Sequence, residues 1–97
     1  MKSVSARENM IDNQIVDKVK KVLVEWFEVE PGIVTPEISL RDDLDFDSLD
    51  TVDFVVALEK EFGFKIVRSR DESFIRALLT LNDVYAFVKD KLDNPAQ

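Results

Sequence analysis

The stretch of sequence that decides the fold is Leu44-Asp-Phe-Asp-Ser-Leu-Asp-Thr-Val-Asp-Phe-Val-Val-Ala-Leu-Glu-Lys-Glu-Phe62. It predicts a helix that begins at Asp47 or Ser48 and ends near Phe62. Asp47 can cap the free amides of the first turn, and Gly63 can adopt the left-handed conformation that stops a helix. The predicted core face carries Val52, Val55, Val56, Leu58 and Phe62, and the predicted polar face carries Asp50, Asp53 and Glu61.

Three further helices are expected around this one. Apolar residues at helical spacing predict an amphipathic helix from Ile11, whose core-facing positions are Ile15, Val16, Val19, Val22, Leu23, Trp26 and Phe27. A short third helix is expected between Lys65 and Leu79, packed by its second half, whose apolar residues are Phe74, Ile75, Leu78 and Leu79. The last helix follows Thr80, which with Asp83 resembles a capping box.

The 17 residues from Pro31 to Asp47 show no sustained period, so they are predicted to form a long loop between the first two helices. The expected fold class is therefore all-α, a four-helix bundle with a short third helix. The 97 residues suffice for one domain. Residues 1–9 and 94–97 are expected to be loose tails.

Composition excludes several function classes. The chain has 20 acidic and 13 basic residues, a net charge of −7, and neither cysteine nor histidine. Disulfides, thiolate nucleophiles and the commonest general base are absent, so an enzyme is not expected. The acidic charge disfavours nucleic acid as a partner. No stretch resembles a signal peptide or a membrane span, so we expect a cytoplasmic protein without stable membrane insertion. We also expect a monomer.

The net charge is concentrated in one part of the chain. Between Glu37 and Phe62 there are nine acidic residues against Arg41 and Lys60, a balance of −7, whereas the remainder carries 11 of each sign. Acidic residues near a helix start also favour the helix dipole, but that does not explain Glu59 and Glu61 at the opposite end. We interpret this region as a surface for basic partners.

Carboxylates at Asp43, Asp45 and Asp47 suggest a calcium loop, but the pattern fails. An EF-hand loop needs glycine at its sixth position and glutamate at its twelfth, where this chain has Ser48 and Phe54. No metal site is expected.

Ser48, by itself, is an ordinary residue for a helix start. The whole run from Leu44 to Phe62, however, closely resembles the prosthetic-group helix of bacterial acyl carrier proteins, and the similarity spans about residues 11 to 92. The resemblance implies that Ser48 accepts 4′-phosphopantetheine from coenzyme A through a carrier-protein synthase, a phosphopantetheinyl transferase. The arm's thiol then carries an acyl group as a thioester for enzymes of fatty-acid or specialised lipid synthesis.

The resemblance also implies a contact surface. Basic patches of the synthase and of the acyl-handling enzymes would meet the helix that bears the serine. The implied contact positions are Asp47, Leu49, Asp50, Asp53, Val56 and Glu59.

The chain departs from the family pattern at several positions. Asp45 stands where a glycine usually lies, which puts the turn before the helix in doubt. The region from Ile66 to Val84 is lengthened and carries Arg68, Arg70 and Arg76, where the family is normally acidic. We expect these arginines to stand near the second helix and to select a dedicated partner, as in a specialised carrier. An aminoacyl or peptidyl carrier, or an unmodified helical interaction module, is the alternative.

Overall fold

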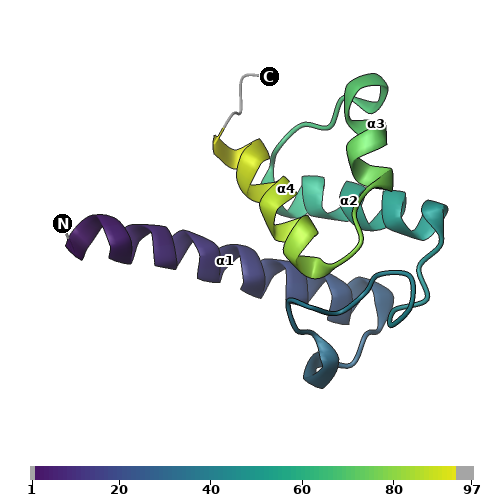
Figure 1. Ribbon diagram of the computed structural model, residues 1–97, viewed down its shortest axis with the longest axis horizontal. Helices are drawn as coiled ribbons and strands as arrows, with labels where there is room; N and C mark the ends of the chain where they lie inside the picture. Colours follow the sequence, from purple (N-terminus) through teal and green to yellow (C-terminus); the bar gives the residue numbers. More distant parts are fainter. Residues whose placement is uncertain (1, 94–97) are drawn as a thin grey trace.

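The computed structural model describes the backbone of residues 2–93, and the side chains of residues 13–67 and 69–93. Over this range the chain forms α1 (Lys2–Phe27), a short 3-10 helix η1 (Pro31–Ile33), α2 (Ser48–Phe62), α3 (Arg68–Arg76) and α4 (Leu81–Asp93). Helix α1 packs against α2 and α4, and α3 packs against α2 (Figure 1). The predicted all-α bundle, with its long first loop and short third helix, is confirmed.

The N-terminal end of α1 differs from the prediction. Residues 1–9 were expected to be a loose tail, but the helix begins at Lys2, because nothing between Lys2 and Phe27 is a proline or glycine that would stop it. Its first turns extend beyond the other helices (Figure 1). Trp26, predicted to face the core, is 55% exposed. The predicted tail at 94–97 lies outside the described residues.

Both ends of α2 form as predicted. The Asp47 carboxylate accepts a hydrogen bond from the Asp50 amide (2.8 Å), and the Asp50 carboxylate accepts one from the Asp47 amide (3.2 Å). Gly63 ends the helix in the left-handed conformation, with φ of 81°. The core face is rotated from the predicted one, since Thr51 and Phe54 are buried while Val52, Val56 and Phe62 are only half-buried.

The long loop is hydrogen-bonded to the segment between α3 and α4. Ser39 and Thr80 form an isolated antiparallel bridge, and the Leu40 amide donates to the Leu79 carbonyl (2.9 Å). Ile38 and Leu40 are buried in the core. The loop therefore packs against the junction between α3 and α4 instead of lying free in solvent.

The start of α4 is the predicted capping box. The Asp83 carboxylate accepts hydrogen bonds from the amides of Leu79 (2.9 Å) and Thr80 (3.1 Å), and the Thr80 hydroxyl accepts one from the Asp83 amide (3.4 Å). From this start, α4 buries Leu81, Val84 and Val88 in the shared core. The box thus fixes the residue at which α4 begins.

Candidate functional site

Ser48 is the first residue of α2, and its side chain is exposed. The capping box at Asp47 and Asp50 fixes where the helix begins and so where the hydroxyl stands. The amides of Ser48 and Leu49 belong to the first turn of α2. Amide groups in the first turn of a helix have no hydrogen-bond acceptor within that helix. An anionic group on the Ser48 oxygen would therefore stand beside amide donors and the positive end of the helix dipole.

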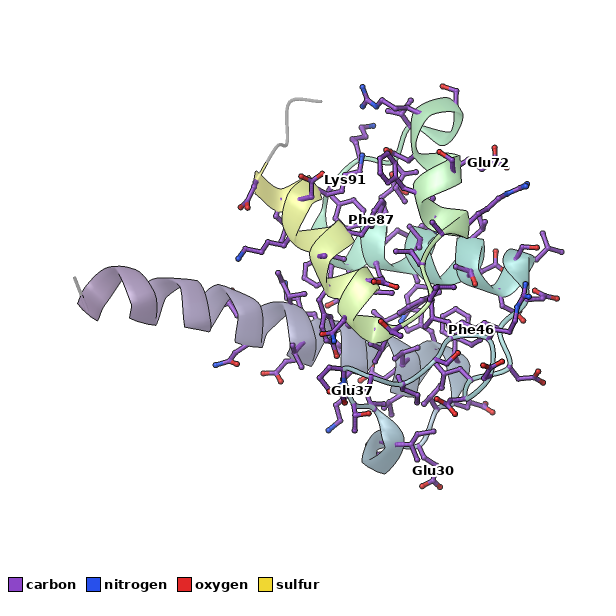
Figure 2. The ribbon with its side chains drawn as sticks, in the orientation of Figure 1. Glu30, Glu37, Phe46, Glu72, Phe87 and Lys91 are labelled. Atoms are coloured by element: carbon purple, nitrogen blue, oxygen red, sulfur yellow. The ribbon has the colours of Figure 1, made fainter. Side chains whose placement is uncertain are left out.

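The turn that leads into Ser48 contains one residue in the left-handed conformation and one buried aromatic residue. Asp45 adopts a left-handed conformation with φ of 59°, and Phe46 is buried. The Phe46 ring lies 5.3 Å from that of Phe27 and 5.8 Å from that of Phe54, centroid to centroid. Figure 2 shows Phe46 at the loop beside α2. Asp45 thus takes the conformation that glycine favours, and Phe46 anchors the turn.

We expect Asp45→Gly to raise the free energy of unfolding by up to about 1 kcal/mol, because glycine adopts positive φ without the steric penalty of a side chain. Urea unfolding measures the change. Asp42→Gly is the matched control, since the described backbone has positive φ at Asp45 and not at Asp42, and this substitution should not stabilise. A stability gain from Asp42→Gly equal to that from Asp45→Gly would contradict the explanation.

A pocket of about 390 Å³ opens beside Ser48, between the end of the long loop, the start of α2 and the segment around α3. Its lining combines apolar side chains with a few charged and polar ones, namely Leu40, Arg41, Phe46, Asp47, Ser48, Thr51, Ile75, Arg76, Leu78 and Leu79. The serine hydroxyl is therefore exposed at the edge of a hollow, where a group attached to it has room to lie.

Two comparisons with known proteins show the family of the chain. The family model for the phosphopantetheine attachment site matches residues 17–70. An acyl carrier protein from Thermosynechococcus vestitus (strain NIES-2133 / IAM M-273 / BP-1) is 39% identical over 83 residues, which cover 86% of this chain and 98% of that protein. The chain belongs to the acyl carrier protein family.

As an acyl carrier protein, the chain is a carrier and not an enzyme, and its prosthetic group is 4′-phosphopantetheine. Acyl carrier proteins work with a phosphopantetheinyl transferase and with acyl-handling enzymes. Among the helices that the structure describes, none combines the length and the apolar character that crossing a lipid bilayer requires. In the same residues, no three or more acidic side chains gather as a metal site.

The six positions predicted to contact partner enzymes divide into two groups in this acyl carrier protein. Leu49 is 74% exposed, Asp53 is exposed and Val56 is half-buried, and their spacing places the three on one stripe of α2. The other three carboxylates also have structural tasks.

Asp47 and Asp50 cap α2, and Glu59 accepts a hydrogen bond from the Ile66 amide (3.0 Å). Charge reversal at Asp50 would therefore also disturb the helix start, contrary to the expectation that Asp50 is a purely polar surface position. Asp53 is the better position for testing partner recognition alone.

Sequence reasoning missed Arg41, and it expected Arg76 near the second helix without connecting it with Ser48; both line the pocket beside that serine. Arg41 belongs to a loop without periodicity, and Arg76 is the last residue of α3, so no sequence spacing connects either of them with Ser48. The α3 arginines were predicted to lie near α2. Arg76 does so, because it lines the same pocket as Ser48 and Thr51 of α2. Arg76 also pairs with Glu72 on its own helix (2.8 Å). The side chain of Arg68 lies outside the described residues.

Helix α3 is joined to α4 by a buried ion pair that the sequence analysis did not identify. The Lys91 ammonium lies 2.6 Å from the Asp71 carboxylate, and both residues are buried. The same carboxylate oxygen accepts a hydrogen bond from the Val67 amide (2.9 Å). Burial raises the pKa of Asp71. The Lys91 ammonium and the hydrogen bond from the Val67 amide together lower this pKa by more than burial raises it, so it lies below the usual 3.8.

Lys91 also borders a groove of about 510 Å³ between α3 and α4. Its apolar side chains include Phe74, Ala77 and Phe87, and the Lys91 ammonium lies 5.8 Å from the centre of the Phe87 ring. Figure 2 shows Phe87 and Lys91 on the side of α4 that faces α3. Phe74 was predicted to pack in the second half of the third helix, but it is 63% exposed because α3 turns Asp71 and Ile75 inward.

Proposed function

We propose that Ser48 is the residue that carries the 4′-phosphopantetheine arm. The observation that supports this most directly is the exposed hydroxyl at the first residue of α2, at the edge of a pocket with room for an attached group. First-turn amides favour a phosphodiester at this position. The arm supplies the thiol that holds an acyl group as a thioester.

Attachment is a phosphoryl transfer. The Ser48 oxygen forms a bond to the phosphorus that carries pantetheine, and the pyrophosphate bond of coenzyme A breaks. Adenosine 3′,5′-bisphosphate leaves, and the hydroxyl proton goes to a base of the synthase. The chain has no histidine or cysteine that could act as that base, so Ser48 is a substrate of the transferase.

The same proposal assigns the exposed face of α2 to the partner enzymes. Leu49, Asp53 and Val56 form an apolar and acidic stripe that begins one residue after Ser48, and Asp47, Asp50 and Glu59 add negative charge beside it. A basic enzyme surface would be attracted to this face, and Leu49 would fill a shallow apolar recess at the contact.

The carrier is further proposed to serve a specialised pathway. Arg70 is exposed on α3, and the apolar groove beside Phe74 and Phe87 gives this side of the molecule a surface different in kind from α2. A dedicated enzyme could use these features to distinguish this carrier from others. The cytoplasmic location and the monomeric state stay predictions from the sequence.

The test is the mass of the intact chain after incubation with coenzyme A and a carrier-protein synthase. We expect wild type to gain one phosphopantetheine and Ser48→Ala to gain none. The Ala variant should remain folded, because the substitution lowers the free energy of unfolding by at most about 1 kcal/mol. Ser73→Ala, which removes an exposed serine from α3, is the matched control and should be modified like wild type.

Two results would contradict the proposal. An arm on the Ser48→Ala variant would assign attachment to another residue, and an unmodified wild type would favour the helical interaction module. The group on the arm's thiol can be identified in protein purified from the organism that produces it. An amino acid there would indicate an aminoacyl carrier, whereas a fatty acyl group supports the proposed role.

Asp53→Lys is expected to slow arm attachment about threefold to tenfold at low salt, because it reverses a charge on the face that attracts a basic synthase. The difference should shrink as salt is added. Rates are measured by mass spectrometry over a time course. Glu25→Lys makes the same charge change on an exposed position of α1, and an equal slowing there would attribute the effect to net charge alone.

A further inference from the structure

Two arginines from distant parts of the chain line the pocket beside Ser48. Arg41 comes from the long loop, and Arg76 ends α3. Among the described residues that line this pocket, the other charged side chain is Asp47. Ser48 thus shares a hollow with two arginine side chains, although the loop and helix that lead into it and follow it are the most acidic part of the sequence.

A phosphodiester on Ser48 would meet an unfavourable field without these arginines. Its negative charge would be added next to Asp47, between residues 37 and 62, where nine acidic residues face two basic ones, one of which is Arg41 itself. The helix start offsets only part of this, since its dipole is equivalent to about half a positive charge. Two guanidinium groups would more than compensate for the new charge.

Both arginines are available for this contact. Arg41 is exposed, and the pair between Arg76 and Glu72 lies on the surface with both side chains largely in solvent. Such exposed pairs contribute little to stability, so the Arg76 guanidinium can exchange Glu72 for a phosphate at small cost. The planar guanidinium presents paired N–H donors that match phosphate oxygens.

We propose that Arg41 and Arg76 bind the phosphodiester of the arm attached to Ser48. The inference rests on the proposed attachment at Ser48. The two guanidinium groups donate hydrogen bonds to the non-bridging phosphate oxygens and so direct the first segment of the arm toward the pocket wall formed by Ile75 and Leu79. The arm then has a preferred resting place between the long loop and the end of α3.

The first test compares the wild-type chain before and after arm attachment, with loading confirmed by intact mass. In nitrogen-15 NMR spectra at low salt, we expect the side-chain Nε–H signals of Arg41 and Arg76 to shift on attachment. The signal of Arg70, which lies on α3 outside the set of lining residues, should stay in place. Unmoved Arg41 and Arg76 signals in fully loaded protein would overturn the inference.

The second test follows the phosphorus-31 signal of the loaded chain. In wild type it should differ from that of a peptide of residues 44–53 bearing the same arm. In the double variant Arg41→Gln and Arg76→Gln it should move toward the peptide value, while the helix start, which the variant keeps, preserves the rest of the difference. Arg70→Gln and Glu72→Gln are controls that keep both lining arginines, and they should retain the wild-type signal.

These readouts separate the two proposals. A wild-type chain that gains no arm would overturn attachment at Ser48, whereas a loaded wild type whose phosphorus signal equals that of the loaded double variant would overturn only the role of the arginines. The comparison of wild type with and without the arm requires no variant, so it decides the inference even where the double variant is loaded slowly.

Discussion

Asp71→Asn is expected to lower the free energy of unfolding by about 3 kcal/mol at neutral pH. Asparagine retains an oxygen that can accept the hydrogen bond from the Val67 amide, but it removes the negative charge 2.6 Å from the Lys91 ammonium. A buried ammonium without its partner is costly to keep in the protein interior. Urea unfolding, combined with hydrogen exchange of the α3 amides, measures the loss.

The effect should depend on pH in a defined direction. Because the pKa of Asp71 is lower in the folded chain than the usual 3.8, its contribution to stability is present above that value. The contribution disappears as the pH falls through the folded-state pKa. The stability difference between wild type and Asp71→Asn should therefore narrow in strong acid, and a difference that widened there would contradict the assignment.

Two further variants separate the causes. Glu72→Gln removes the next carboxylate along the chain, whose pair with Arg76 is exposed, and should change stability by less than about 1 kcal/mol. Adding Lys91→Met to Asp71→Asn should recover most of the loss, since it removes the unpaired charge. Equal losses from Asp71→Asn and Glu72→Gln would contradict the importance of burial.

Phe54→Ala is expected to lower the free energy of unfolding by about 4 kcal/mol. The Phe54 side chain is fully buried, and its ring packs edge-on against Phe27 at 5.9 Å and against Phe46 at 5.8 Å. Alanine would leave a cavity and would remove both aromatic contacts. Because Phe46 anchors the turn before Ser48, the turn should also become more mobile, which hydrogen exchange of the residue 44–48 amides would detect.

Phe74→Ala is the matched control for this substitution. It makes the same chemical change on a ring that is 63% exposed, and it should alter stability by less than about 0.5 kcal/mol. Phe54→Leu keeps most of the buried volume and provides a milder variant that remains folded if the alanine variant does not. A Phe54→Leu protein as stable as wild type would show that the aromatic contacts add little.

The parts of the fold that the sequence predicted are those determined by local chemistry. The capping box before Ser48, the left-handed stop at Gly63 and the box formed by Thr80 and Asp83 each depend on residues a few positions apart. The role of Ser48 was predicted because a continuous run of sequence around it resembles acyl carrier proteins. Such features need no knowledge of what packs against them.

The features that the sequence did not predict depend on packing between distant segments. The run from Phe54 to Leu58 is apolar at every position, so periodicity alone could not decide which side of α2 faces the core. The pair of Asp71 and Lys91 joins two helices, and the pocket that Arg41 and Arg76 both line forms only where the loop packs beside α3. No local pattern distinguishes these charges from ordinary surface charges.

The bridge between Ser39 and Thr80 has a consequence for the order of folding events. It closes a long loop of chain, and the entropy lost in that closure is recovered only when α2 and α4 already hold the two segments near each other. The loop is therefore expected to dock after the folding transition state. Its contacts would then slow unfolding and hardly affect the rate of folding.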